Sequence, residues 1–253
     1  MDFDKWRPWY ERILTAFSFD WSEDAKSADL LEKLLEGKAI LPSAVQRIVE
    51  RENAVVFGCG PSLERNLNEY LTSGLKGRSI SIAADGATTS LLRGYHLVPE
   101  IVVTDLDGDV GDLVDASKKG SVVVIHAHGD NEISLMRYVP KFGSVLGSTQ
   151  VEARPHVYNF GGFTDGDRAA FLAEEVGAKR VILLGMDFGT VAGKYSKPGH
   201  IMDYRAGSKK IRKLQMAKEL LSWLASWARA EILNATGSGE KIDGVDNVTL
   251  GEL

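Results

Sequence analysis

The chain has 253 residues, of which 44% are hydrophobic, so it can bury the core of one α/β domain with an appendage. Its net charge of −5 argues against a nucleic-acid-binding protein, which usually presents a basic face. The single cysteine, Cys59, excludes an internal disulfide. Because the start lacks the pattern of a signal peptide and no apolar run reaches ~18 residues, we expect a cytoplasmic protein away from membranes.

Residues 1–50 predict an N-terminal helical segment. Apolar residues follow helical spacing over 29–35 and 44–50, and Gly37 and Pro42 interrupt the pattern. The segment is also rich in aromatic residues, which would suit a lid, a homodimer surface or ordinary packing. We expect packing, because large aromatic side chains most often serve burial.

From residue 51 the pattern changes, and residues 51–235 predict an α/β catalytic domain. Short apolar runs alternate with helical stretches and end at residues 57, 84, 103, 125, 160 and 184. Continuous apolar runs are typical of strands that are covered on both faces, so we expect a mostly parallel, doubly wound sheet. A long C-terminal helix is predicted over about 209–233, followed by a tail over residues 236–253.

The segment 104–109 places three carboxylates, including Asp105 and Asp107, directly after an apolar run. In an open α/β sheet the ligand crevice lies outside the carboxyl ends of the strands, where Asp85 and Asp165 are also expected. Carboxylates at such short distances repel one another unless a cation neutralises them or some are protonated. Mg²⁺ is commonly held by one or two carboxylates and substrate phosphates, so we expect Mg²⁺ rather than a solvated acidic turn.

Three further loops follow predicted strands. Residues 58–62 (Gly-Cys-Gly-Pro-Ser) form either an anion-binding turn at a helix start or a tight turn that needs no ligand. We expect Cys59 to be structural. The cluster around His126 and His128 is expected to hydrogen-bond substrate; a zinc site is the alternative. In the loop 161–168, Thr164 or Asp165 is placed to cap a helix.

The order of these motifs resembles two families. Residues 84–87, 104–108 and 163–167 are similar to turns of thiamin pyrophosphokinases, although Thr104 and Gly108 replace their Gly and Ser. The predicted C-terminal helix also stands where that family has a β-sandwich. A fuller match, over nearly the whole chain, resembles the archaeal 6-hydroxymethyl-7,8-dihydropterin pyrophosphokinases. It is carried by the segments 58–63, 104–107, 126–131, 162–168 and 185–189.

The resemblance implies Mg²⁺-dependent transfer of diphosphate from ATP to a hydroxymethyl-pterin, giving AMP, in tetrahydromethanopterin or folate-type cofactor synthesis. The alternatives are a thiamin-type or other pyrophosphokinase and a Mg²⁺–nucleotide-binding module without turnover.

Phosphoryl-type transfer mainly requires positioned substrates and neutralised charge. We expect Asp85, Asp105, Asp107 and Asp165 to bind the metal, and either Asp107 or Asp165 to accept the hydroxyl proton. The predicted substrate contacts are Gly58, Gly60, Pro61, Ser62, Asp85, His126, His128, Asn131, Thr164, Arg168 and Asp187. Candidate phosphate contacts are Lys194, Lys197, Lys209 and Arg168, together with the basic residues at 209–213.

Overall fold

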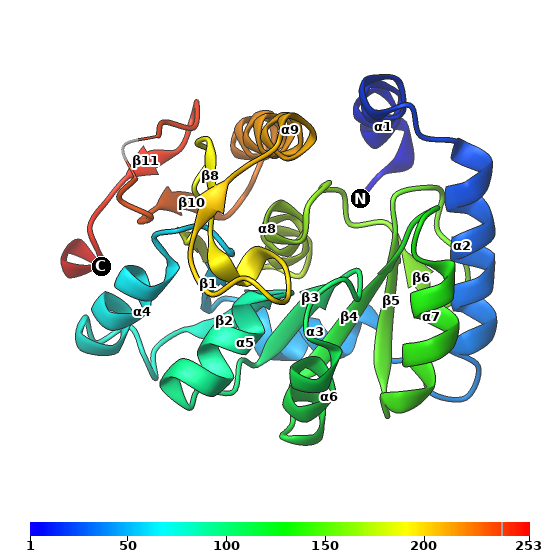
Figure 1. Ribbon diagram of the computed structural model, residues 1–253, viewed down its shortest axis with the longest axis horizontal. Coiled ribbons are helices and arrows are strands. Elements are labelled where there is room, and N and C mark those ends of the chain that lie inside the picture. The colour runs from blue at the N-terminus through cyan, green and yellow to red at the C-terminus, as the bar shows by residue number, and fades with distance from the viewer. Residues whose placement is uncertain (239) are drawn as a thin grey trace.

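The computed structural model describes residues 1–238 and 240–253, and a single sheet dominates it (Figure 1). Its strands lie in the order β11-β10-β7-β1-β2-β3-β4-β5-β6, and every neighbouring pair is parallel. The strands are β1 (Asn53–Phe57), β2 (Ile80–Ala84), β3 (Ile101–Thr104), β4 (Val122–Ala127), β5 (Val145–Thr149), β6 (Val157–Tyr158), β7 (Arg180–Leu184), β10 (Glu231–Asn234) and β11 (Asp246–Asn247). The predicted parallel α/β sheet is confirmed.

Helices cover both faces of this sheet. They are α1 (Phe3–Phe17), α2 (Trp21–Leu34), α3 (Pro42–Val49), α4 (Leu63–Thr72), α5 (Ala87–Thr89), α6 (Val110–Lys118), α7 (Glu132–Tyr138), α8 (Asp165–Glu175) and α9 (Ser208–Ala225). Figure 1 shows α8 and α9 on one side of the sheet, with α4, α5 and α6 on the other. Two short strands, β8 (Val191–Ala192) and β9 (Tyr204–Arg205), form a separate antiparallel ribbon.

Burial on both faces explains the continuous apolar runs. In β1, Ala54 and Val56 pack with α8 on one face, whereas Val55 and Phe57 pack with α4 on the other. Because successive side chains point to opposite faces, a strand that is covered twice must be apolar at every position. This is why a run without alternation predicted each of these strands.

The predicted helix over about 209–233 is wrong at its C-terminal end. α9 stops at Ala225, and residues 231–234 form β10, which pairs in parallel with β7. The buried Glu174 carboxylate accepts hydrogen bonds from the backbone N–H groups of Arg229 and Ala230, at 3.0 and 2.8 Å. These bonds direct the chain into the sheet, a tertiary effect that helical spacing does not reveal.

β5 is a strand that the sequence pattern does not predict. Its residues 147–149 are Gly-Ser-Thr, which is a weak strand signal, yet all five residues of the strand are buried. A side chain at Gly147 would lie 2.6 Å from the carbonyl oxygen of His156 and 2.7 Å from Leu35, so only glycine fits there. The strand therefore depends on its neighbours more than on its own composition.

The N-terminal segment consists of three helices that pack on the domain. Trp6 and Tyr10 are fully buried, and the Trp6 indole donates a hydrogen bond to the carbonyl of Gln150 at 2.8 Å. The packing role expected for these two aromatics is confirmed, whereas Trp21 is 46% exposed. Among the described residues, none of the helices combines the length and the hydropathy that crossing a bilayer requires.

Candidate active site

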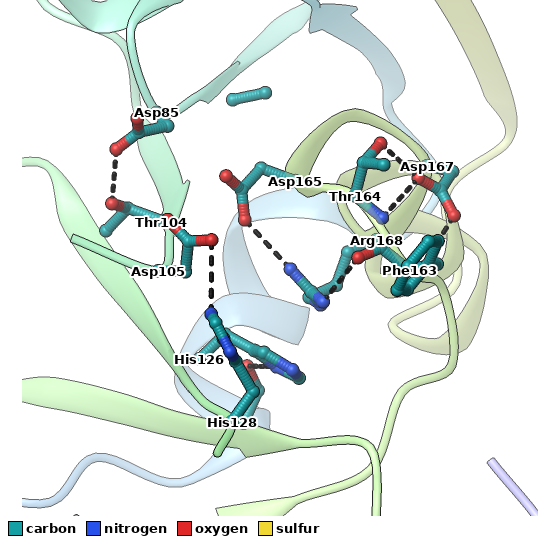
Figure 2. A network of polar contacts seen from close by, with 12 residues as sticks. Asp85, Thr104, Asp105, His126, His128, Phe163, Thr164, Asp165, Asp167 and Arg168 are labelled. Carbon is teal, nitrogen blue, oxygen red and sulfur yellow. Dashed lines mark hydrogen bonds and ion pairs between the residues drawn. The ribbon is translucent and has the colours of Figure 1, made fainter. Parts of the chain in front are cut away.

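Three carboxylates meet at the carboxyl edge of the sheet. Asp85 follows β2, Asp105 follows β3, and Asp165 begins α8. One oxygen from each lies within 4.8 Å of the others, although the three residues are far apart in the chain. Figure 2 shows Asp165 between this pair of strand ends and Arg168. The predicted convergence of these acidic loops is therefore observed, while their role as metal ligands stays a prediction.

The loop after β2 has an unusual backbone conformation at Asp85. Asp85 has a φ of +34°. Positive φ values are rare for residues other than glycine, and the strained examples cluster at functional sites. The Thr104 hydroxyl donates a hydrogen bond to its carboxylate, and a side chain at Gly108 would lie 2.4 Å from it. Glycine at position 108 thus makes room for the Asp85 carboxylate.

The protonation of this cluster reflects its crowding. Burial, together with the charges of Asp105 and Asp107, raises the pKa of Asp85 well above its usual value. Burial and the charge of Asp105 also raise the pKa of Asp165 well above its usual value, even though Arg168 pairs with it at 2.8 Å. Without a cation, the cluster therefore reduces its repulsion by taking up protons.

Asp105 differs because a histidine neutralises it. Burial opposes its ionisation, but the hydrogen bond from His128 lowers the pKa of Asp105 below its usual value. The His128 ring contacts Asp105 at 3.3 Å through Nε2 and Asp130 through Nδ1. Burial would lower the pKa of His128, but these two carboxylates outweigh burial and raise it to about 9. At neutral pH, His128 is therefore a cation that bridges two anions.

A cavity of about 470 Å³ opens above these carboxylates. Its walls include Asp107 and seven of the predicted substrate-contact residues: Gly58, Gly60, Asp85, His128, Asn131, Thr164 and Asp187. Pro61, Ser62, His126 and Arg168 do not line it. Thr164 precedes α8 as expected, and the Asp167 carboxylate accepts hydrogen bonds from the backbone N–H groups of Phe163 and Thr164, both at 2.7 Å.

The residues outside the cavity have structural partners instead. The Ser62 hydroxyl does not cap α4 but donates to Asp187 at 2.6 Å. His126 is buried and contacts the Ser148 hydroxyl at 3.1 Å, while Arg168 donates to Asp165 and to the carbonyl of Phe163. Sequence placed each of these residues beside a strand end but could not reveal which way its side chain turns.

The glycines after β1 serve close packing between two loops. A side chain at Gly58 would lie 2.6 Å from the Gly185 carbonyl oxygen, and one at Gly60 would lie 2.0 Å from the Asp187 carboxylate. β1 and β7 are neighbours, and the chain winds in opposite directions away from them, which is where open α/β sheets form their ligand crevice. The two glycine-bearing loops therefore meet at the switch point and close one end of the cavity.

Lysines also line the cavity and form its basic wall, which consists of Lys197, Lys209, Lys210 and Lys213. Lys209, Lys210 and Lys213 extend from the first turns of α9, and Lys197 lies beside Asp107 at 3.9 Å. Lys194 does not line the cavity and pairs with Glu64. In the sequence, Lys210 and Lys213 stand out only as members of the basic cluster at 209–213. The signal that identifies the basic wall is the spacing of residues 209, 210 and 213, which places them along one side of a helix.

These lysines lack anionic partners. Within the described part of the chain, no carboxylate lies within 4.0 Å of Lys209, Lys210 or Lys213. The Lys213 ammonium lies 5.5 Å from the centre of the Phe163 ring, and burial lowers its pKa. Lys209 is exposed and Lys210 and Lys213 are partly exposed, so their ammonium groups are available to an anion in the cavity.

The fold and this site agree with the result of a family comparison. A family model described as "6-hydroxymethylpterin diphosphokinase MptE-like" matches residues 29–193. The chain belongs to this family.

Three curated relatives extend the match to nearly the whole chain. All are named 6-hydroxymethyl-7,8-dihydropterin pyrophosphokinase. The protein of Pyrococcus furiosus is 46% identical, with 92% of this chain and 98% of the relative covered. That of Methanothermobacter thermautotrophicus is 44% identical, with 88% and 95% covered. That of Methanocaldococcus jannaschii is 40% identical, with 92% and 100% covered.

One solved structure shares the fold alone. It is the MAf glycosyltransferase from Magnetospirillum magneticum AMB-1, with a TM-score of 0.52 and 16% sequence identity. The match covers 81% of this chain but only 35% of the glycosyltransferase chain. This likeness therefore concerns the architecture and carries no information about the reaction.

Proposed function

We propose that this protein transfers a diphosphate group from ATP to the hydroxymethyl oxygen of 6-hydroxymethyl-7,8-dihydropterin, giving AMP and the pterin diphosphate. The observation that carries the proposal is one cavity lined both by clustered carboxylates and by three lysines of α9 that form no ion pair among the described residues. Such an arrangement suits a metal-bound polyphosphate. The names of the three relatives support the pterin as the acceptor.

The carboxylates fit a magnesium ion. Mg²⁺ prefers oxygen ligands, and Asp85, Asp105 and Asp165 offer three carboxylate oxygens within 4.8 Å of one another. Neighbouring carboxylate charges contribute to the raised pKa values of Asp85 and Asp165, and a bound cation would relieve this repulsion. We assign these three residues as the ligands, with Asp107 beside them. A bound Mg²⁺ would neutralise the phosphate charge that develops during transfer.

The basic wall supports the position of the phosphates. Lys209, Lys210 and Lys213 line the same cavity as the carboxylates and form no ion pair in the described part of the chain. We assign these lysines, together with Lys197, to the phosphates of ATP. Arg168 is paired with Asp165, and Lys194 is paired with Glu64. We therefore do not assign Arg168 or Lys194 to the phosphates.

Asp107 is the best candidate to accept the proton of the pterin hydroxyl. Its side chain is 51% exposed at the cavity wall, whereas the Asp165 carboxylate is held by Arg168. Partial burial and the Asp105 charge raise the pKa of Asp107, which brings it closer to the operating pH of a general base. Asp165 is thereby left to the metal.

A substrate panel with AMP release as the readout tests the proposal. The purified protein is incubated with ATP, Mg²⁺ and either the reduced hydroxymethyl-pterin, thiamin or no acceptor. We expect AMP formation with the pterin in stoichiometric amounts with pterin diphosphate. AMP formation with thiamin alone would assign the thiamin-type activity, and tight binding of Mg²⁺–ATP without AMP from either acceptor would favour a binding module.

A further inference from the structure

A buried carboxylate outside the cavity, that of Asp24 in α2, connects three parts of the molecule. Asp24 is only 3% exposed. Its Oδ2 accepts hydrogen bonds from the Tyr10 hydroxyl and the Gln150 side-chain amide, and its Oδ1 accepts one from the Gly129 N–H, each at 2.7 Å. Burial and the Asp24 bond raise the pKa of Tyr10, so its hydroxyl stays a donor. One side chain thus joins α1, the end of β5 and the loop between β4 and α7.

That loop carries the histidine that compensates Asp105. Gly129 stands between His128 and Asp130, whose side chains are paired with each other. The neighbouring Asn131 binds the loop to the strand end, because its amide donates to the Asp105 carbonyl at 3.0 Å and its oxygen accepts from the His128 N–H at 3.1 Å. The position of Gly129 therefore influences how His128 meets Asp105.

The contact between this loop and α2 leaves no room for a side chain at Gly129. A side chain at Gly129 would lie 2.6 Å from the Cβ of Glu23, the residue before Asp24. Hydrogen bonds to a charged acceptor are stronger than those between neutral groups, and the Gly129 N–H is directed at such an acceptor. The loop is thus both bonded to the start of α2 and packed against it.

We propose that Asp24 is a positioning residue of the active site, which fixes Gly129 and through it holds His128 against Asp105. The catalytic consequence rests on the proposed pyrophosphokinase function; the positioning of the loop does not. Asp24 and Tyr10 precede the residues matched by the family model, which begin at residue 29. The N-terminal helices accordingly form part of the working site, beyond the packing expected of them.

Hydrogen–deuterium exchange on the full chain without metal or ATP tests the positioning directly. Asp24→Ala removes all three bonds, whereas Tyr10→Phe removes one bond to the same carboxylate and leaves the Gly129 bond intact. We expect faster exchange over residues 126–131 in Asp24→Ala than in Tyr10→Phe. Equal exchange over residues 126–131 in the two variants would overturn the proposal, whether or not the wild type forms AMP.

Steady-state kinetics then test the consequence for the site. Loss of an outer partner of a metal ligand typically weakens metal affinity or activity 10–100-fold. We expect the Mg²⁺ concentration for half-maximal rate to rise on the order of tenfold in Asp24→Ala, with the KM for the pterin unchanged from Tyr10→Phe. An unchanged Mg²⁺ dependence would contradict the link to Asp105.

A second substitution keeps the test decisive if Asp24→Ala does not fold. Gly129→Ala leaves Asp24 intact but forces the loop away from Glu23, so it should lengthen the same hydrogen bond. We expect it to reproduce both the faster local exchange and the shifted Mg²⁺ dependence. Wild-type exchange and kinetics in Gly129→Ala would overturn the proposal.

Discussion

Asp105 and Asp107 are two residues apart, yet their surroundings differ, and we propose different roles for them. The Asp105 carboxylate lies among the three clustered oxygens and is paired with His128, whereas Asp107 is half exposed beside Lys197. Proximity in sequence therefore does not imply one role. The Mg²⁺ dependence of variants at each position distinguishes the proposed roles of the two aspartates.

Asparagine substitutions provide that separation. We expect Asp105→Asn to lower the rate more than about 100-fold and to raise the Mg²⁺ requirement, because a proposed metal ligand would be lost. Asp107→Asn should lower kcat by about 10²–10⁴-fold with an unchanged Mg²⁺ requirement, as for loss of a general base. The assay is AMP release over a range of Mg²⁺ concentrations.

Asp109→Asn is the matched control for these two variants. Asp109 lies in the same loop but caps α6 and pairs with Arg93 outside the cavity. Since asparagine is also a good N-cap residue, activity and thermal stability should remain close to those of the wild type. Near-normal turnover in both Asp105→Asn and Asp107→Asn would remove these carboxylates from the mechanism.

At the scale of elements, the start of α9 supplies the positive wall of the cavity. Three of its lysines line the cavity, while Arg212, on the same turns, lies over the Phe17 ring and does not line it. Lys213 thus lies at the cavity, whereas Arg212 lies against the N-terminal segment. This division can be tested by exchanging single residues.

Lys213→Gln should raise the KM for ATP roughly tenfold or more, because a hydrogen bond to a charged group contributes about 1.5–3 kcal/mol. Arg212→Gln is the control, since it also removes a cation from an aromatic ring but not from the cavity. Initial rates against ATP concentration distinguish the two. Equal effects of both substitutions would argue against a phosphate contact at Lys213.

The turn between α9 and β10 depends on Glu174. Its carboxylate satisfies two backbone N–H groups, of which that of Ala230 is buried. Leaving a buried donor without a partner costs about 1–3 kcal/mol, so Glu174→Ala should lower the free energy of unfolding by that amount or more. Urea denaturation measures it. Glu174→Gln, which retains one acceptor oxygen, should lose less, and equal stability of both variants would contradict the role.

For the molecule as a whole, the acidic cluster links stability to pH and metal. In the metal-free protein, three groups of the site hold more protons in the folded state than in the unfolded chain, because the pKa values of Asp85 and Asp165 are raised well above the usual value and that of His128 is raised to about 9. Stability must then fall with increasing pH wherever the folded state holds the extra protons.

We therefore expect the Tm in EDTA to decrease as the pH rises from about 6.5 to about 9, through the range in which His128 loses its proton. Mg²⁺ should raise the Tm, most strongly at the alkaline end, where it no longer competes with protons for the carboxylates. Thermal melts in EDTA and in Mg²⁺ measure both effects. A Tm in EDTA that rises with pH would show that the loss of these protons does not destabilise the metal-free folded state.

The sequence alone determined the sheet class and the edge at which the carboxylates gather. Continuous apolar runs require burial on both faces, and parallel strands place their carboxyl ends on one side, so Asp85 and Asp105 were predictably neighbours. Both inferences depend on local pattern and on chain direction, which a sequence contains in full.

Only the tertiary structure decided the side chains whose partners are distant in the chain. β10 forms where it can pair with β7 and where Glu174 binds the turn before it. His126 contacts Ser148 and does not line the cavity, whereas Lys213 lines the cavity from a helix that starts more than 20 residues after β7. Asp24 contacts Gly129, which is 105 residues later. Such contacts are made across the sheet edge by packing and hydrogen bonding, so no local pattern of residues encodes them.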